Sequence, residues 1–164
     1  MKLQNYIDGK MVAPIAGSYL PNIEPATGQV YSEIPDSQKE DIAAAYAAAE
    51  KAFPVWSNTP AEKRSRIMMR VSELIEEKLD ALATAESKDN GKPLKLAKAV
   101  DIPRASSNFR FYATAILHDA SESHFMEQTA INYTLRRPIG VVGCLSPGNL
   151  PLYLFSCNIA PGLA

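Results

Sequence analysis

The amino-acid sequence predicts an α/β protein with short N-terminal strands, long amphipathic helices and the start of a doubly wound parallel sheet. Three observations support this prediction. Turn residues separate short apolar segments before residue 35, capping residues precede helical repeats of apolar positions over 37–117, and residues 139–145 form a continuous apolar run. A run of this last kind is typical of a strand covered on both faces in a parallel sheet.

The N-terminal segment is expected to form a β-meander. Asp8-Gly9 lies between Tyr6-Ile7 and Met11-Val12, and this dipeptide readily adopts the positive φ angles of a type I′ hairpin turn. A second pair of strands is expected over 18–23 and 29–34, because residues 25–28 carry turn chemistry.

The middle of the chain is expected to form three helices. Residues 37–40 and 59–62 have the spacing of capping boxes at the starts of the first two helices. Pro54 is expected to end the first helix and Gly91 the second. The third helix should be broken or kinked near Pro103, because proline has no N–H to donate within a helix.

From residue 130 onwards the pattern of apolar residues differs from that of the helical part of the chain. Residues 130–138 begin with alternating apolar and polar side chains, as a strand with one wet face does. The strand expected over 139–145 leads into a Pro/Gly turn and then into an apolar, uncharged helix. That helix is shorter than the roughly 20 residues needed to cross a bilayer, so we expect it to be buried in the core and to have no membrane role.

Composition excludes several function classes. The 164 residues carry 17 Lys and Arg against 18 Asp and Glu, a net charge of −1, which excludes a strongly basic nucleic-acid binder. His118 and His124 lack metal-ligand spacing, so no metal site is expected. Cys144 and Cys157 are expected to be buried, inert thiols rather than a disulfide framework. Without a signal sequence at the N-terminus, these features favour the cytoplasm.

Two polar residues are candidates for a functional site. Asn149 lies in the turn after the expected buried strand, where α/β proteins tend to bind ligands. Its amide either donates a hydrogen bond to charge developing on a carbonyl oxygen or caps the following helix. Arg104 is either a solvated charge or the bidentate partner of a carboxylate.

The chain resembles the N-terminal third of an NAD(P)-dependent aldehyde dehydrogenase, and the resemblance covers essentially the whole chain. The motifs that carry it occur in the family's order: Asn5–Lys10, Asn22–Gly28, Phe53–Trp56, Arg137–Gly143 and Leu145–Leu152. Three stretches look most like the branch that oxidises muconic semialdehydes such as 2-aminomuconate or 2-hydroxymuconate semialdehyde: Asp101–Arg104, Asn108–Ala113 and Ser146–Tyr153.

The resemblance implies roles for individual residues. Arg104 matches the arginine that helps to hold a substrate carboxylate, and Asn149 matches the asparagine that stabilises the oxyanion. The stretch lining the nicotinamide side of NAD or NADP matches Leu145, Ser146, Pro147, Gly148 and Asn149. Gly148 departs from the family, which usually has tryptophan there, and this puts cofactor affinity in doubt.

The resemblance also implies an N-terminal fragment of the aldehyde dehydrogenase fold. Residues 1–129 match the strands and helices of the cofactor-binding domain, residues 130–138 a strand of the oligomerisation sheet, and residues 139–164 the first strand, turn and helix of the cofactor and substrate cleft. A homo-oligomer with a small-molecule aldehyde substrate, and without nucleic acid, is therefore expected.

The family mechanism is covalent. A cysteine thiolate attacks the aldehyde, hydride passes to NAD, and water activated by a glutamate releases the acid. The resemblance places that cysteine and glutamate beyond residue 164, and neither Cys144 nor Cys157 matches the nucleophile's motif. We therefore expect a truncated enzyme that is inactive by itself. The alternative is a non-catalytic oligomerisation or structural module, or a relic of such an enzyme.

Overall fold

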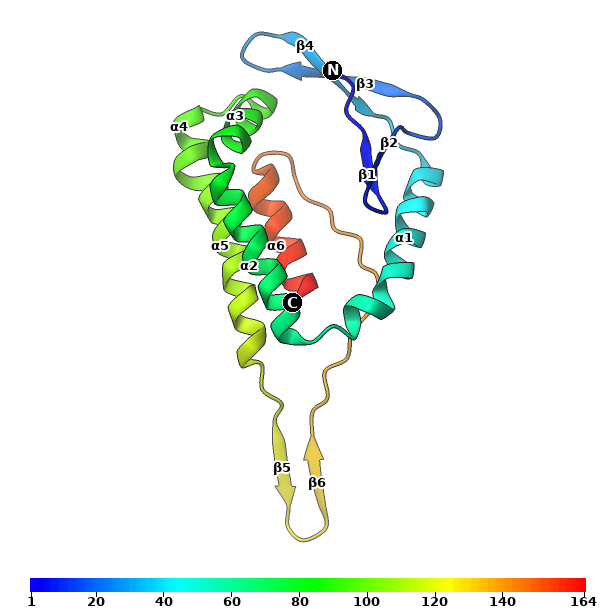
Figure 1. The fold of residues 1–164 in the computed structure, drawn as a ribbon, viewed down its shortest axis with the longest axis vertical. Coiled ribbons are helices and arrows are strands. Elements are labelled where there is room, and N and C mark those ends of the chain that lie inside the picture. The colour runs from blue at the N-terminus through cyan, green and yellow to red at the C-terminus, as the bar shows by residue number, and fades with distance from the viewer.

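The computed structural model describes residues 1–164 and consists of packed helices with antiparallel hairpins attached to them (Figure 1). The strands pair as three hairpins: β1 (Asn5–Ile7) with β2 (Lys10–Val12), β3 (Tyr19–Glu24) with β4 (Gln29–Pro35), and β5 (Ser123–Met126) with β6 (Ala130–Tyr133). The helices are α1 (Lys39–Ser57), α2 (Ala61–Glu77), α3 (Leu79–Asn90), α4 (Leu94–Leu96), α5 (Ile102–Ala115) and α6 (Pro151–Leu163). Two shorter helical segments are the π-helical turn η1 (Ala97–Asp101) and the 3-10 turn η2 (Ile116–His118).

The predicted N-terminal strands form, and the turn chemistry explains the first hairpin. Asp8 and Gly9 have φ angles of 51° and 75°, the positive values that a type I′ turn requires at both central positions. The two hairpins remain separate two-stranded sheets rather than one continuous meander. Pro21 lies within β3, and a proline suits an edge strand because it has no N–H to donate to a neighbouring strand.

Helix α1 differs from the sequence prediction at both ends. The capping carboxylate belongs to Asp41 rather than Glu40, and it accepts hydrogen bonds from the N–H groups of Gln38 and Ile15, each at 2.9 Å. At the other end, α1 continues through Pro54 to residue 57. A proline in the last turn costs one hydrogen bond, and the rest of a 19-residue helix stays intact.

The helix predicted over 59–91 is divided into α2 and α3 at Lys78. Gly91 ends α3 with a φ of 76°, the left-handed conformation for which glycine is favoured, so the predicted end is confirmed. The predicted cap at Thr59 is wrong, because Pro60 occupies the N-cap position of α2. The Thr59 hydroxyl instead donates to the carbonyl of Val55 at 2.8 Å.

The irregularity predicted near Pro103 is confirmed as a π-helical turn. η1 ends directly before α5, and Pro103 lies in the first turn of α5. Because Pro103 has no N–H, the regular α-helical hydrogen-bond pattern cannot run unbroken through this point. A wider turn is one of the ways in which a helix accommodates such a residue.

The core lies where α2, α5 and α6 pack together. Its buried apolar residues come mainly from these helices: Met68, Ile75, Ala83, Ala97, Ile102, Ala105, Phe109, Ala113 and Ala160. Several positions on α5 are alanine, which lets neighbouring helices approach closely. The apolar helix predicted at the C-terminal end is therefore confirmed as α6, which packs on α5.

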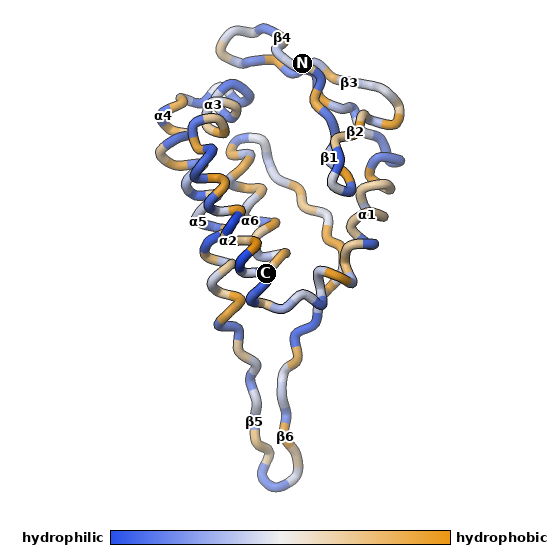
Figure 2. Tube along the Cα trace, viewed as in Figure 1, coloured by the Kyte–Doolittle hydropathy of each residue, from blue (hydrophilic) through white to orange (hydrophobic).

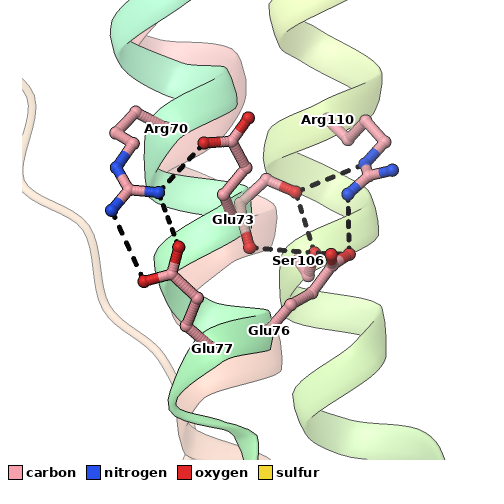
Figure 3. Close-up of polar contacts among 7 residues, drawn as sticks. Arg70, Glu73, Glu76, Glu77, Ser106 and Arg110 are labelled. Atoms are coloured by element: carbon pink, nitrogen blue, oxygen red, sulfur yellow. Dashed lines mark hydrogen bonds and ion pairs between the residues drawn. The ribbon is translucent and has the colours of Figure 1, made fainter.

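A polar network fixes the register between α2 and α5 (Figure 3). The hydroxyls of Ser72 and Ser106, both fully buried, lie 2.8 Å apart. Glu76 of α2 accepts hydrogen bonds from Ser106 at 2.8 Å and from Arg110 of α5 at 2.7 Å. In the same view, Arg70 pairs only with glutamates of its own helix, so it does not bridge α2 and α5.

Residues 139–145 do not form the predicted strand. No helix or strand is present between β6 and α6, and the apolar residues along this segment are visible in Figure 2. Leu145 is 94% exposed, and Ile139 and Val142 are exposed as well. A parallel strand needs neighbouring strands to pair with its N–H and C=O groups, and no parallel strand lies beside this segment. The mixed α/β class holds, whereas a parallel sheet is not formed among residues 1–164.

None of the helices combines the length and the apolar composition that crossing a bilayer requires. The most apolar helix, α6, has 13 residues.

Candidate active site at the start of helix α6

The turn before α6 leaves the side chain of Asn149 free. The N-cap position of α6 is Leu150, and no side chain caps the helix there. Asn149 is exposed, and its amide makes no hydrogen bond to the rest of the chain. Only its backbone carbonyl has a partner, the Nδ2 of Asn90 at 3.4 Å. Of the two interpretations of Asn149, the helix cap is therefore not observed.

Asn158 holds the segment that approaches this turn. Its Nδ2 donates to the carbonyl of Leu145 at 3.3 Å and to the hydroxyl of Ser146 at 3.1 Å. Asn158 lies on α6, so the helix that follows the turn also orients the segment that precedes it. Sequence reasoning missed this residue, although an amide within an uncharged, largely apolar helix was an available signal.

Arg104 lies on α5 and faces the first turn of α6. Its Nη1 donates to the hydroxyl of Tyr153 at 3.4 Å, and its guanidinium carbon lies 5.3 Å from the centre of the Tyr153 ring. No carboxylate oxygen lies within 4.0 Å of the Arg104 nitrogens, unlike those of Arg70, Arg110 and Arg136. The guanidinium is thus oriented by an aromatic ring without being neutralised.

A buried ion triad includes Asp101, the acidic residue that lies closest before Arg104 in the sequence. Asp101 precedes Arg104 by three residues, but it is 2% exposed and pairs with Lys92. The ammonium of Lys92 also lies 2.8 Å from the carboxylate of Glu86. Burial lowers the pKa of Lys92, but hydrogen bonds to Asp101 and Glu86 outweigh burial and hold that pKa above its ordinary value.

The loop that carries Lys92 also contacts the turn at Asn149, through the side chain of Asn90. Next to Lys92, Asn90 accepts a hydrogen bond from the Lys92 N–H at 3.0 Å, while its amide donates to the Asn149 carbonyl. None of the triad residues was a sequence candidate, because nothing in the spacing of Glu86, Lys92 and Asp101 distinguishes them from surface charges.

The predicted site residues therefore lie around the start of α6. Leu145 to Asn149 form one exposed segment that leads into the helix. Arg104 contacts Tyr153, four residues after Asn149. No direct contact joins Arg104 to Asn149, so the link between them runs through the first turn of α6.

The cysteines and histidines lie apart from this arrangement. Cys144 is exposed, which corrects the prediction of a buried thiol, because the covering strands that would bury residues 139–145 are not formed. Cys157 is half-buried and accepts a hydrogen bond from Asn108 at 3.2 Å. Both thiols are free. His118 and His124 are exposed, and no group of three or more His, Cys, Asp or Glu side chains is placed to hold a metal ion.

A mixed α/β architecture with an exposed amide before a helix, and with an arginine that has no ion pair across from it, provides polar groups that can bind a small-molecule ligand. The chain belongs to the aldehyde dehydrogenase family, whose sequence model matches residues 12–164. It is 47% identical to the human 2-aminomuconic semialdehyde dehydrogenase over 165 aligned positions, which cover 100% of this chain and 34% of that protein. The chain thus spans about a third of the length of the curated relatives it matches.

Solved structures share the fold over nearly the whole chain. HpcC from Thermus thermophilus superposes with a TM-score of 0.95 at 35% identity, covering 99% of this chain and 32% of that one. PnpE from Pseudomonas sp. WBC-3 superposes with a TM-score of 0.94 at 33% identity, covering 99% of this chain and 34% of that one. PnpE has also been solved in complex with nicotinamide adenine dinucleotide. The predicted family and fold are confirmed.

Proposed function

We propose that these residues form the oxyanion and carboxylate-binding part of an NAD(P)-dependent enzyme that oxidises a carboxylate-bearing semialdehyde to the acid. The observation that carries the proposal is the Arg104 guanidinium, which extends from α5 to Tyr153 of α6 with no carboxylate of the chain to neutralise it. An arginine of this kind suits a ligand carboxylate. The similarity to 2-aminomuconic semialdehyde dehydrogenases supports the same substrate class.

Asn149 is the proposed oxyanion stabiliser. Its amide is exposed and uncommitted, so it can donate to an oxygen on which negative charge develops. The hydrogen bond from Asn90 to the Asn149 carbonyl restrains the backbone while leaving the side chain available. A hydrogen bond to an oxyanion that forms only in the transition state favours that state over the ground state.

Residues 145–149 are the proposed contacts for the nicotinamide side of NAD or NADP. The segment is exposed, and Asn158 fixes the backbone at its start. No atom of the chain lies within 4 Å of the position that a Cβ would take at Gly148, so this side of the turn is open. The cofactor, when bound, supplies a hydride acceptor. Gly148 provides less contact surface than the family's usual tryptophan, and we expect weak cofactor binding.

We expect the 164-residue chain to bind its ligands but not to catalyse the oxidation. Neither Cys144 nor Cys157 resembles the family's nucleophile, and without a thiolate attack Asn149 has no oxyanion to stabilise. The test is to mix the purified chain with NAD and a carboxylate-bearing semialdehyde and to follow reduced cofactor by absorbance. Turnover would contradict the proposed inactivity of the isolated chain.

The carboxylate role of Arg104 is tested by Arg104→Gln. We expect adipate, a six-carbon dicarboxylate, to bind the wild-type chain and to bind the variant about tenfold more weakly, because a charged hydrogen-bond donor is lost. The measurement is an NMR titration of the labelled chain. Arg66→Gln is the matched control, since Arg66 is an exposed arginine of α2 with no ion pair. Equal affinities for Arg104→Gln and wild type would contradict the proposed site.

We further propose that the chain associates through the β5–β6 hairpin, within residues 130–138 and the strand before them. The hairpin projects from the helices (Figure 1), every residue of both strands is exposed, and each strand has one unpaired edge. Phe125 and Ile131 are direct cross-strand partners and present an apolar face to solvent. Unpaired edges with apolar side chains invite pairing with a second chain. The same hairpin favours the second candidate function, a non-catalytic assembly module.

Replacing Phe125 and Ile131 with lysine and glutamate should shift the chain towards a monomer, because the apolar face is removed. Light scattering after size exclusion measures the mass. Glu127→Lys, in the turn of the same hairpin, is the control and should leave the mass unchanged. A wild-type chain that elutes as a single monomer at high concentration would refute association.

We place the protein in the cytoplasm, where thiols stay reduced. The free state of both cysteines, one of them exposed, supports this placement. The near-zero net charge supports a small-molecule partner rather than nucleic acid.

A further inference from the structure

The hydroxyl of Tyr153 has an unused donor. A guanidinium has only N–H groups and no acceptor, so in the 3.4 Å contact the Tyr153 oxygen accepts and Arg104 donates. The phenol therefore keeps its own O–H proton, and no group of the chain accepts it. The hydroxyl of this half-buried tyrosine therefore has a spare proton and lies beside a cation.

The Tyr153 ring also orients Arg104. The guanidinium carbon lies 5.3 Å from the ring centre, within the range of a cation–π interaction. This contact restricts a long and otherwise flexible side chain, which reduces the entropy that ligand binding would cost. The donors of Arg104 that do not contact Tyr153 remain open to a ligand.

The local charge balance favours an anion at this pair. Arg104 has no ion pair, and the acidic residue one turn before it, Asp101, is already paired with Lys92 inside the protein. A ligand carboxylate would therefore meet a positive charge without competing against a carboxylate of the chain. Carboxylates form their strongest hydrogen bonds with charged donors.

We propose that Tyr153 is a substrate-binding residue that determines specificity for carboxylate-bearing aldehydes. Its O–H and the Arg104 guanidinium donate to the same carboxylate, so that the two side chains form one anion-binding pair. This inference rests on the proposed carboxylate role of Arg104. It extends that role by assigning a second, neutral donor from α6, the helix that begins next to Asn149.

Tyr153→Phe and Tyr153→Leu separate the two contributions of the tyrosine. Phenylalanine keeps the ring and removes the O–H, whereas leucine removes both. We expect about tenfold weaker adipate binding for Tyr153→Phe, the factor that corresponds to one charge-assisted hydrogen bond. Tyr153→Leu should weaken binding further. Adipamide, which has the same length and no charge, should bind all three proteins with the same low affinity.

The controls distinguish failure of this inference from failure of the proposed function. Tyr133→Phe, a matched change on the exposed β6 strand, should leave adipate binding unchanged, and circular dichroism checks that each variant is folded. If Arg104→Gln weakens binding and Tyr153→Phe does not, the tyrosine inference is overturned and the proposed function stands. If neither variant weakens adipate binding, or the wild type binds adipate and adipamide equally, both are overturned.

Discussion

Replacing Lys92 with methionine is expected to lower the free energy of unfolding by about 3–5 kcal/mol, because it leaves two buried carboxylates without a cation. The ammonium lies between Asp101 and Glu86, whose side chains are 2% and 4% exposed. Urea denaturation followed by circular dichroism measures the change. Lys95→Met is the matched control, since Lys95 is exposed and has no ion pair, and its effect should stay within about 0.5 kcal/mol.

A rescue experiment identifies the cause. Adding Glu86→Gln and Asp101→Asn to Lys92→Met removes both uncompensated charges, and we expect most of the lost stability to return. If the triple variant is no more stable than Lys92→Met, lost packing rather than unpaired charge explains the loss.

The pH dependence has a defined sign. The pKa of Lys92 is higher in the folded state than in the unfolded state. The stability that Lys92 contributes is therefore fully present below about pH 10, near the unfolded pKa of lysine. It is lost as the pH rises through the raised pKa of the folded state.

Truncating Phe109 to alanine should cost about 3–5 kcal/mol, because it opens a cavity in the core between α2, α5 and α6. Phe109 is 4% exposed and belongs to the main apolar cluster. The same helix supplies the control. Phe111 is 63% exposed, and its main aromatic contact is an edge-to-face arrangement with Tyr112 at 5.0 Å. Phe111→Ala should therefore cost about 1 kcal/mol or less.

Thermal unfolding of the two alanine variants provides the comparison. A native stability of about 5–15 kcal/mol is typical of a domain, so Phe109→Ala should populate unfolded chains well below the wild-type midpoint. Equal midpoints for both variants would mean that residues 105–113 do not form the core described above.

Local sequence signals predicted the hairpins and most helices because those elements depend on near neighbours. Asp8-Gly9 requires no distant partner to form its turn, and Gly91 ends a helix through its own backbone freedom. Errors arose where two adjacent residues could serve the same purpose. Asp41 rather than Glu40 caps α1, because Asp41 also receives the Ile15 N–H, a contact 26 residues away that no local pattern encodes.

The strand predicted over 139–145 failed for a different reason. Its apolar residues carry the signature of a covered strand, but pairing requires neighbours that are absent beside it among residues 1–164. The exposure of Cys144 follows from the same cause. Sequence pattern can therefore report the environment for which a segment is suited even where the described residues do not provide that environment.

For the candidate site, the resemblance supplied Arg104 and Asn149, and the structure supplied their surroundings. Tyr153 and Asn158 were unpredictable as site residues because their relevance comes from α6 packing against α5 and folding back on residues 145–146. The Lys92 triad could not be predicted either, because Glu86 of α3 and Asp101 of η1 become partners of Lys92 only when η1 packs against α3.

The π-helical turn η1 also changes the orientation of α4, which precedes it, about the helix axis relative to α5, which follows it. A π-helical turn takes up about one residue more than an α-helical turn, so the segments before and after it are offset by roughly 100° from an uninterrupted helix. Deleting one residue from 97–100 would rotate α4, and with it the preceding loop that carries Lys92, relative to Asp101. The number of residues that precede Asp101 in this turn therefore helps to determine whether the acid before Arg104 stays paired with Lys92.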